Sequence, residues 1–287
     1  MVTIRNDASL RGKIRSVAKR AGLRPQELLQ MYLFEHLLLR LEKSPYAEKF
    51  VLKGGLLIAS MIGVSLRTTM DMDTTVVGMS LDRANIERAI KDICGVDVGD
   101  EMEYIFERIE PIRTDDEYAN WRAHVRVRYG RMNASVKVDI TTGDSIVPKQ
   151  IEYPYPMMFE DGAINVLSYP VATILAEKFE TVVVRGVANT RGRDFYDIYA
   201  FLKLYNEDID FVQVKQALDA TAVKRGSSSS VAEYKYRLEE IRASETMLSV
   251  WSEYTKLTPY ASAISFIDVV NAAIQLGDSI FAKSSNT

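Results

Sequence analysis

The sequence contains very little cysteine and histidine, and this shortage excludes several kinds of site. Its 287 residues include one cysteine, Cys94, and two histidines, His36 and His124. A single cysteine cannot form an intrachain disulfide, so we expect a reducing compartment, the cytoplasm. A Cys/His zinc cluster is nearly excluded. Hydrolases that use Ser-His-Asp or Cys-His groups also have little support, because Cys94 has no obvious partner and His36 lies on an apolar helix, where a packing role is simpler.

The sequence also lacks an excess of positive charge and long apolar runs. The formal net charge is -3, whereas proteins that coat nucleic acid are normally basic, so any polynucleotide must bind at a local patch. No signal pattern opens the sequence, and its apolar runs are well short of the roughly 20 residues of a membrane span. With 47% hydrophobic residues, the composition fits a soluble globular protein of one large domain or two closely packed ones.

Hydrophobic periodicity predicts an α+β protein whose C-terminal half is helical. Two helices are expected between Ser9 and Glu42, and a β-branched run at Thr74–Val77 is followed by a helix at Asp82–Ile93. Three strands are predicted after it, at Met102–Ile112, Trp121–Tyr129 and Ala134–Ile140. The later helices are expected at Val171–Val184, Asp194–Tyr205, Phe211–Ala220, Ser230–Ile241 and Ala263–Leu276, with a loop at Ser227–Ser230. The predicted organisation is a catalytic domain at 1–165 with an N-terminal helical extension, and a helical domain at 166–287 that completes the active site.

Two basic surfaces are candidate contacts for a polyanion. The first expected helix carries Arg11, Lys13, Arg15, Lys19 and Arg20. In the strand at 121–129, Arg126 and Arg128 alternate with valines, so one face of the strand is cationic. The alternative for both surfaces is an ordinary solvated face.

The pair Asp71 and Asp73 is the strongest chemical signal. In an extended segment, residues i and i+2 point to the same face with α-carbons about 6.5 Å apart. Two such carboxylates suit Mg²⁺, which prefers hard oxygen ligands and keeps phosphate oxygens in its remaining positions. An isolated Asp-x-Asp is usually a pair of surface acids, so its setting decides the interpretation.

Three further motifs favour nucleotide chemistry. Gly54 and Gly55 precede an expected helix, where backbone N–H groups can approach a phosphate closely. The strand Ser135–Ile140 places Lys137 and Asp139 on one face, and Asp139 is a candidate third metal ligand or a base for an attacking hydroxyl. Glu177-Lys178 and Arg191-Gly-Arg-Asp-Phe-Tyr-Asp197 supply cations that can neutralise a triphosphate.

In this order, the motifs resemble those of the AbiEii/AbiGii-type toxin nucleotidyltransferases of bacterial toxin–antitoxin and phage-defence systems. The motifs are Phe50-Val-Leu-Lys-Gly-Gly55, Arg67-Thr-Thr-Met-Asp-Met-Asp73, Lys137-Val-Asp139, Glu177-Lys178 and Arg193-Asp-Phe-Tyr-Asp197. The likeness covers at least residues 9–205. It departs from the wider superfamily where Gly54-Gly55 replaces the usual Gly-Ser, and in a longer spacer between Gly55 and Asp71.

The resemblance implies a fold related to DNA polymerase β, with a mixed β-sheet, N-terminal helices and a helical C-terminal half. It implies metal ligands at Asp71, Asp73 and Asp139, and a nucleotide site and catalytic residues drawn from the same motifs. The nucleotide-binding residues would be Lys53, Gly54, Gly55, Arg67, Lys178 and Arg193, and the catalytic residues Asp71, Asp73, Asp139, Lys178 and Asp194.

The implied function is a toxin that transfers a nucleoside monophosphate from an NTP to an acceptor, with Mg²⁺ or Mn²⁺ as cofactor. By resemblance the acceptor is RNA, with a tRNA 3′ end as the best single choice. The resemblance also implies a separately encoded antitoxin protein, and whether that protein binds this chain directly is left open. Two alternatives remain: a kinase that uses the same carboxylates and cations, and a non-catalytic nucleotide-binding regulator.

Overall fold

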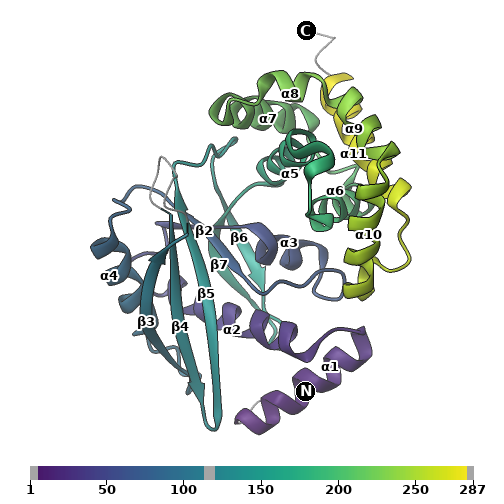
Figure 1. Ribbon diagram of the computed structural model, residues 1–287. Helices are drawn as coiled ribbons and strands as arrows, with labels where there is room; N and C mark the ends of the chain where they lie inside the picture. The colour runs from purple at the N-terminus through teal and green to yellow at the C-terminus, as the bar shows by residue number, and fades with distance from the viewer. Residues whose placement is uncertain (1–5, 113–119, 283–287) are drawn as a thin grey trace. The chain divides into compact units, whose positions relative to one another are not determined.

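The computed structural model describes residues 6–112 and 120–282, which divide into two compact units. The first unit comprises the chain up to Asp144 together with Ile151–Ser168. The second comprises Ser145–Gln150 and the chain from Tyr169 onward. All strands of the described chain belong to the first unit, whereas the second is built from helices (Figure 1).

A seven-stranded mixed sheet forms the centre of the first unit, in the order β3-β4-β5-β2-β1-β7-β6. Strands β1 and β7 are parallel, as are β2 and β5, and the other neighbours are antiparallel. The strands are β1 (Phe50–Lys53), β2 (Met72–Val76), β3 (Glu103–Pro111), β4 (Trp121–Tyr129), β5 (Met132–Thr142), β6 (Ile151–Pro156) and β7 (Ala163–Ser168). The predicted α+β class with a mixed sheet is confirmed, although β6 and β7 were not among the predicted strands.

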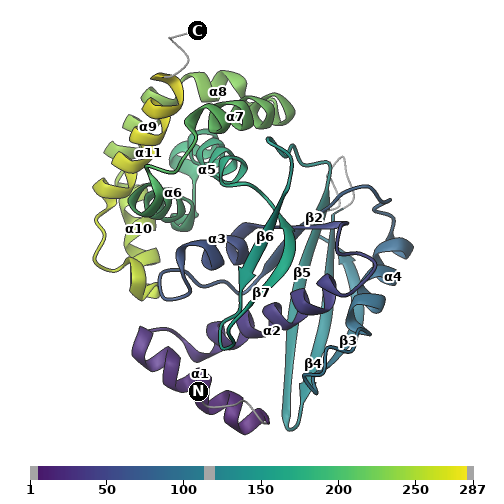
Figure 2. The same ribbon diagram turned by 180° about the vertical axis from the view of Figure 1, so that it is seen from behind.

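Four helices accompany the sheet: α1 (Asp7–Ala21), α2 (Pro25–Glu42), α3 (Gly54–Ile62) and α4 (Arg83–Cys94). The two predicted N-terminal helices are confirmed. Asn6 caps α1 in a capping box, and Gly22 ends it in the left-handed conformation at φ +66°. Helix α2 lies along the sheet in Figure 2 and packs against β5, β7 and α4, so it is buried over most of its circumference. The apolar side chains of β5, such as Val136 and Ile140, are fully buried.

A buried ion cluster ties α2 to the loop before β3. Arg40 is 2% exposed and donates two hydrogen bonds, of 2.7 and 2.6 Å, to the Asp100 carboxylate. His36 Nδ1 lies 2.7 Å from the same carboxylate. Burial by itself would raise the pKa of Asp100, but the hydrogen bonds from His36 and Arg40 hold that pKa well below its usual range. His36 therefore has the core role expected from its apolar helix.

As far as the structure describes the second unit, it contains the α-helices α5 (Val171–Arg185), α6 (Gly192–Tyr205), α7 (Phe211–Arg225), α8 (Ser228–Ala232), α9 (Tyr234–Ala243), α10 (Glu245–Leu257) and α11 (Phe266–Ala282), with two short 3-10 helices between them. Helix α5 packs against α6, α7, α9 and α11, and its Phe179 is fully buried. A Cβ at Gly277 of α11 would collide with the ring of Tyr234, so this glycine allows α11 and α9 to pack closely.

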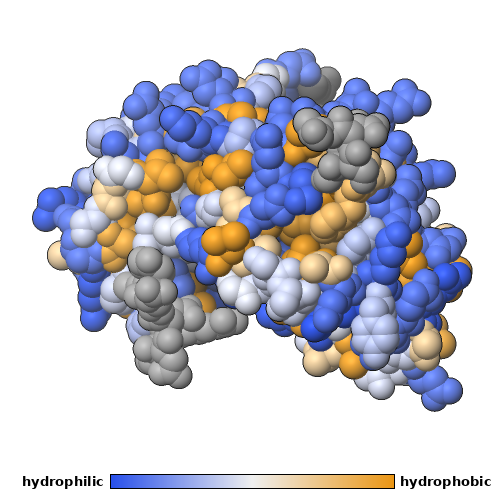
Figure 3. Space-filling model, turned by 90° about the horizontal axis from the view of Figure 1, so that it is seen from above, coloured by the Kyte–Doolittle hydropathy of each residue, from blue (hydrophilic) through white to orange (hydrophobic). Residues whose placement is uncertain are grey.

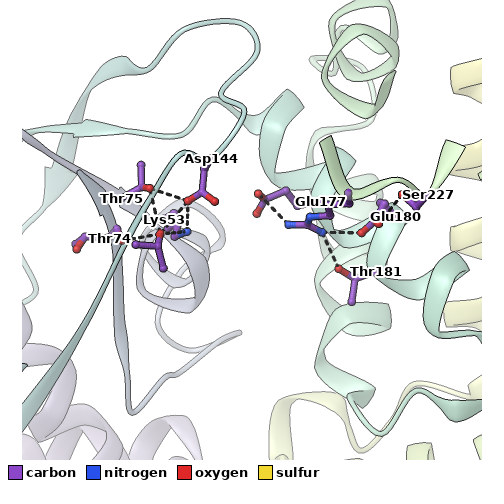
Figure 4. A network of polar contacts seen from close by, with 10 residues as sticks. Lys53, Thr74, Thr75, Asp144, Glu177, Glu180, Thr181 and Ser227 are labelled. Carbon is purple, nitrogen blue, oxygen red and sulfur yellow. Dashed lines mark hydrogen bonds and ion pairs between the residues drawn. The ribbon is translucent and has the colours of Figure 1, made fainter. Parts of the chain in front are cut away.

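The loop predicted at Ser227–Ser230 is wrong. Ser227 is buried and donates a hydrogen bond of 2.8 Å to Glu180, and α8 begins at the next residue (Figure 4). Arg225 also reaches Glu180, at 2.6 Å, and Glu177, at 3.2 Å. A buried carboxylate needs such donors, and serine suits a helix start, so the segment is ordered by its partners. The helix predicted at Ser230–Ile241 is divided at Glu233, and α10 was not predicted.

The face shown in Figure 3 is mainly hydrophilic, with several patches of hydrophobic residues among the hydrophilic ones. Single apolar side chains at a surface need no functional explanation. No helix in the described ranges is both long and apolar enough to cross a membrane.

Candidate functional site

A row of charged residues runs across five neighbouring strands of the sheet. Lys53 of β1 pairs in register with Asp73 of β2, which pairs with Asp139 of β5. Asp139 in turn pairs with Arg122 of β4, and Arg122 with Glu110 of β3. Residues paired in register point to the same face of a sheet. This charge row therefore brings together three sequence-predicted residues, Lys53, Asp73 and Asp139, from three separate motifs.

The N-terminus of α3 lies directly against Asp73. Gly54, the first residue of α3, has φ +67°, and a Cβ there would lie 2.8 Å from Asp73 Cγ, closer than real side chains approach. Gly55 is restricted by space alone, since a Cβ there would lie 2.8 Å from Thr69 Oγ1. The α3 N-cap residue, Lys53, makes no side-chain capping bond. Gly54 thus lets a carboxylate lie beside the end of a helix whose N–H groups attract anions.

Asp71 lies one residue before β2 begins, and both Asp71 and Asp73 are half-buried. Thr69 fixes the backbone here, because its hydroxyl donates to the Asp71 carbonyl at 3.2 Å. The predicted nucleotide-binding residue Arg67 is 4% exposed, and its guanidinium donates to the Thr68 carbonyl. Arg67 also lies beside Gly55, with Nη2 3.3 Å from where a Cβ would be. Arg67 therefore stands against the start of α3, largely shielded from solvent.

Asp139 is held by a two-pronged ion pair. Arg122 donates from Nε at 2.7 Å and from Nη2 at 2.8 Å, one bond to each carboxylate oxygen. Hydrogen bonding to Asp139, together with the charges of Asp139 and Asp71, raises the pKa of Arg122 above its ordinary value. Such fork-to-carboxylate pairs are the strong ones among side-chain contacts. The sequence identified Asp139 but not its partner.

The donor set at Asp71 and Asp73 fits a divalent cation. Both are hard carboxylate ligands, and Mg²⁺ commonly takes one or two such ligands and completes its shell with water and substrate phosphate oxygens. No three His, Cys, Asp or Glu side chains in the described ranges are arranged to hold a metal ion. That finding agrees with the engagement of both Asp139 oxygens by Arg122.

Lys53 belongs to a polar cluster that sequence reasoning missed (Figure 4). Its ammonium contacts Asp144 and donates to Thr141 Oγ1 at 2.7 Å. Thr75 and Thr141 donate to the same Asp144 oxygen at 2.6 and 2.9 Å. Burial alone would raise the pKa of Asp144, but Lys53 and the two hydroxyls hold it well below its usual range. Thr141 lies two residues after Asp139 on β5. The alternation of side chains along that strand, which puts both on one face, was the sequence signal for this cluster.

The second unit contains the remaining predicted residues. Lys178 of α5 lies 2.6 Å from Asp194 and 2.8 Å from Asp197, both on α6. Burial by itself would lower the pKa of Lys178, but the charges of Asp197 and Asp194 raise it above its ordinary value. Asp194 Oδ2 is buried and, within the described part of the chain, accepts no hydrogen bond. Arg193, also on α6, is exposed.

Asp197 was quoted within its motif but not proposed as a site residue. Residues three apart on a helix are neighbours on one face, so the spacing from Asp194 to Asp197 was the signal that could have found it. Asp197 is fully buried. Two carboxyl groups thus contact one ammonium in this cluster.

The strand face proposed as a basic patch is largely neutralised by ion pairs. Arg126 contacts Glu107, and Arg128 lies 3.7 Å from Glu103 on the neighbouring strand β3. On α1, by contrast, Arg15, Lys19 and Arg20 are exposed, so this helix keeps the more cationic surface.

The chain is similar to known proteins in sequence and in fold. The sequence model of a family described as "Nucleotidyl transferase AbiEii toxin, Type IV TA system" matches residues 36–257. No curated protein sequence matches the chain. Among solved structures, JHP933 from Helicobacter pylori is similar with a TM-score of 0.50 and 16% identity, covering 92% of this chain and 97% of that one. A putative nucleotidyltransferase from H. pylori covers 91% of this chain and 99% of its own, with a TM-score of 0.47 and 16% identity.

Proposed function

Because the chain belongs to the AbiEii family of nucleotidyl transferase toxins, we propose that it transfers a nucleoside monophosphate from an NTP to RNA, with a tRNA 3′ end as the preferred acceptor. The observation that carries this proposal is the placement of Asp73 against the N-terminus of α3 by Gly54. A helix end that attracts phosphate and a carboxylate that attracts a divalent cation are thereby adjacent.

The proposed reaction assigns distinct roles to the residues of the first unit. Asp71 and Asp73 would hold Mg²⁺ or Mn²⁺, which when bound neutralises charge on the triphosphate and orients it. Backbone N–H groups at Gly54 and Gly55 would bind phosphate oxygens, with Lys53 and Arg67 as nearby cations. The acceptor hydroxyl oxygen forms a bond to the α-phosphorus while the bond to the β-phosphate oxygen breaks, and pyrophosphate leaves.

Asp139 has two candidate roles in this scheme: it is either the base that accepts the acceptor hydroxyl's proton or a third metal ligand. Both require it to share its oxygens with a group other than Arg122. In the structure Arg122 binds both oxygens, so an Arg122→Leu variant should change the activity if Asp139 takes part.

The assignment of Lys178, Asp194 and Arg193 to the same reaction rests on the family motifs. Under this proposal, Lys178 and Arg193 would bind the triphosphate, and Asp194 would hold the Lys178 ammonium in place. Asp197, as the second carboxylate on Lys178, joins Asp194 as a positioning residue.

Labelled nucleotides separate the leading proposal from its two alternatives. Protein, cellular RNA and Mg²⁺ are incubated with NTPs carrying label at the α- or the γ-phosphate. Retention of only the α label in RNA supports nucleotidyl transfer, whereas retention of the γ label would mean that the protein is a kinase. A non-catalytic regulator would leave no label, and its cellular effect would survive Asp71→Asn.

The acceptor is tested by sequencing the 3′ ends of cellular RNA after expression of the wild type and of Asp71→Ala. Glu87→Gln, which changes a partly exposed carboxylate on α4, is the matched control. New 3′ nucleotides on tRNA in the wild type and the control, but not in Asp71→Ala, are expected. Growth arrest without new 3′ nucleotides would refute RNA extension as the toxic activity. If α1 contacts the RNA, its affinity should also fall steeply with added salt.

A further inference from the structure

Arg122 lies between two carboxylates of the charge row. Asp139 of β5 stands in register with it on one side, and Glu110 of the edge strand β3 stands in register on the other. Arg122 donates both prongs of its fork to Asp139, whereas the Glu110 carboxylate contacts His124 at 2.8 Å and Arg108 at 3.5 Å. The guanidinium is thus turned toward the proposed site and away from the edge of the sheet.

A divalent cation at Asp139 would need the oxygens that Arg122 engages. The ion pair is partly shielded from solvent, with 32% of the Arg122 side chain and 16% of the Asp139 side chain exposed. The hydrogen bonds and charge of Asp139, and then the charge of Asp71, raise the pKa of Arg122 above its ordinary value, so the guanidinium lies within the field of both carboxylates. A guanidinium held in this place repels a second cation at short range.

The position of Arg122 also accounts for the arrangement of the three carboxylates. Asp73 and Asp139 stand in register on neighbouring parallel strands, but no three acidic side chains of the described ranges are placed to hold one metal ion. Strand β5 lies between β4 and β2, and Arg122 binds Asp139 from the β4 side. The structure therefore directs the Asp139 carboxylate toward β4, away from Asp73.

Glu110 offers Arg122 a second place to bind. Side chains directly opposed on antiparallel strands have Cβ atoms about 4.5–5.5 Å apart, which is within the reach of an arginine. The Glu110 side chain is 45% exposed, so a guanidinium that turned to it would keep both a counter-charge and contact with water. Release of Asp139 would therefore not leave the positive charge of Arg122 without a partner.

We propose that Arg122 is a positioning residue that holds Asp139 out of the metal site and competes with a divalent cation for its oxygens. This inference rests on the proposed function, since it takes Asp71 and Asp73 as the other metal ligands. It assigns Asp139 to the role of third ligand and not to that of the base. The site gains its third carboxylate only when Arg122 turns away from Asp139.

Binding of Mn²⁺ alone to the full chain, followed by the electron paramagnetic resonance of free Mn²⁺, tests the competition without the reaction. Arg122→Leu should bind Mn²⁺ roughly tenfold more tightly than the wild type, because it removes the competing charge. Arg122→Lys keeps the charge but lacks the fork, so its affinity should fall between the two. Arg126→Leu is the matched control, since Arg126 pairs with Glu107 on the same face of β4, about 13 Å further along, and should bind like the wild type.

A double-mutant comparison separates direct competition from a general effect of charge. In an Asp139→Asn background, adding Arg122→Leu should raise the Mn²⁺ affinity by no more than about threefold, because the contested ligand is missing. A tenfold gain in that background would mean that Arg122 acts only through its charge, and would overturn the proposal. An unchanged affinity in Arg122→Leu alone would also overturn it and would favour the base role for Asp139.

Thermal unfolding shows whether Arg122→Leu is folded and whether it uses the released carboxylate. The variant leaves Asp73 and Asp139 opposed without the guanidinium, so in EDTA it should unfold at a lower temperature than the wild type. Added Mn²⁺ should then raise its unfolding temperature by more than it raises that of the wild type. A smaller rise in the variant would contradict competition for Asp139.

Failure of the proposed function has its own signature. If Asp71→Asn binds Mn²⁺ like the wild type, the metal site of the proposed function is wrong, and the role of Arg122 is wrong with it. Weak binding by Asp71→Asn together with equal binding by Arg122→Leu and the wild type would refute the role of Arg122 alone. The expected result is weak binding by Asp71→Asn and tighter binding by Arg122→Leu.

Discussion

Replacing Gly54 by alanine tests the proposed site with the smallest possible change. At φ +67° an L-residue is strained by about 1–2 kcal/mol. The added Cβ would also lie 2.8 Å from both Cβ and Cγ of Asp73. A new rotamer would move the Asp73 carboxylate but not its Cβ, so the backbone of β2 or of the start of α3 must also shift, against the register of β2 with β1 and β5.

The structure supplies a matched control. Gly22, at the end of α1 in the same unit, has φ +66°, and a Cβ there would meet nothing within 4 Å. Gly22→Ala therefore carries the same backbone strain without moving a carboxylate. Gly22→Ala should lose about 1–2 kcal/mol of unfolding free energy, and Gly54→Ala should lose that and roughly 1–3 kcal/mol more for overpacking against Asp73. Both losses are measured by urea titration with the fluorescence of Trp121, which lies in this unit.

The two variants should differ in activity. A reacting group displaced by about 1 Å costs roughly a hundredfold in rate, so Gly54→Ala should lose about that much α-label transfer, whereas Gly22→Ala should retain it. Near wild-type transfer by Gly54→Ala would show that the position of Asp73 does not matter to the reaction. Equal losses in both variants would assign the effect to stability instead.

Three further perturbations have expected outcomes that follow from buried charges. Burial raises the pKa of Glu35 from 4.5 to about 8, so the folded state favours the protonated carboxyl. The free energy of unfolding that Glu35 contributes is therefore fully present below about pH 4.5 and is lost as the pH rises through 8. Urea titrations across this range should show the loss in the wild type and not in Glu35→Gln. Asp100→Asn leaves the buried Arg40 guanidinium without its counter-charge and should cost about 3–5 kcal/mol of unfolding free energy, with an unchanged urea midpoint as the contrary result. Asp194→Asn removes one of two carboxylates from Lys178 and should cost less, about 2 kcal/mol, while reducing α-label transfer; full transfer would argue against its positioning role.

Much of the sheet could be predicted from alternation, and the exceptions have identifiable causes. Strand β4 was predicted with its observed bounds, because valines alternate with charged residues along it. Strand β1 was seen only as an apolar stretch, since three of its four residues are buried and no alternation is left to detect. Strand β6 contains Pro154 and Pro156, which argue against a strand, but it lies at the edge of the sheet, where proline is tolerated.

The carboxylates of the candidate site could be predicted from the sequence, but their partners could not. Asp71 and Asp73 stand in one short motif at the start of β2, and Asp139 stands with Lys137 in another on β5, so each spacing is visible within its own segment. Arg122 contacts Asp139 because of the register between β4 and β5, and Asp144 contacts Lys53 because the chain turns after β5. Hydrophobic periodicity specifies neither the register nor the turn.

The charge row also separates a requirement of the fold from a requirement of the site. Asp73 and Asp139 stand directly opposite each other on parallel strands, and like charges in that position destabilise a sheet. Packing alone would be better served by a neutral side chain at either position. Arg122 offsets part of the repulsion by binding Asp139, and the α3 N-terminus beside Gly54 offsets part of it at Asp73. Two carboxylates kept adjacent despite their repulsion, each beside a different source of positive charge, are better explained by a requirement of the proposed site than by a requirement of packing.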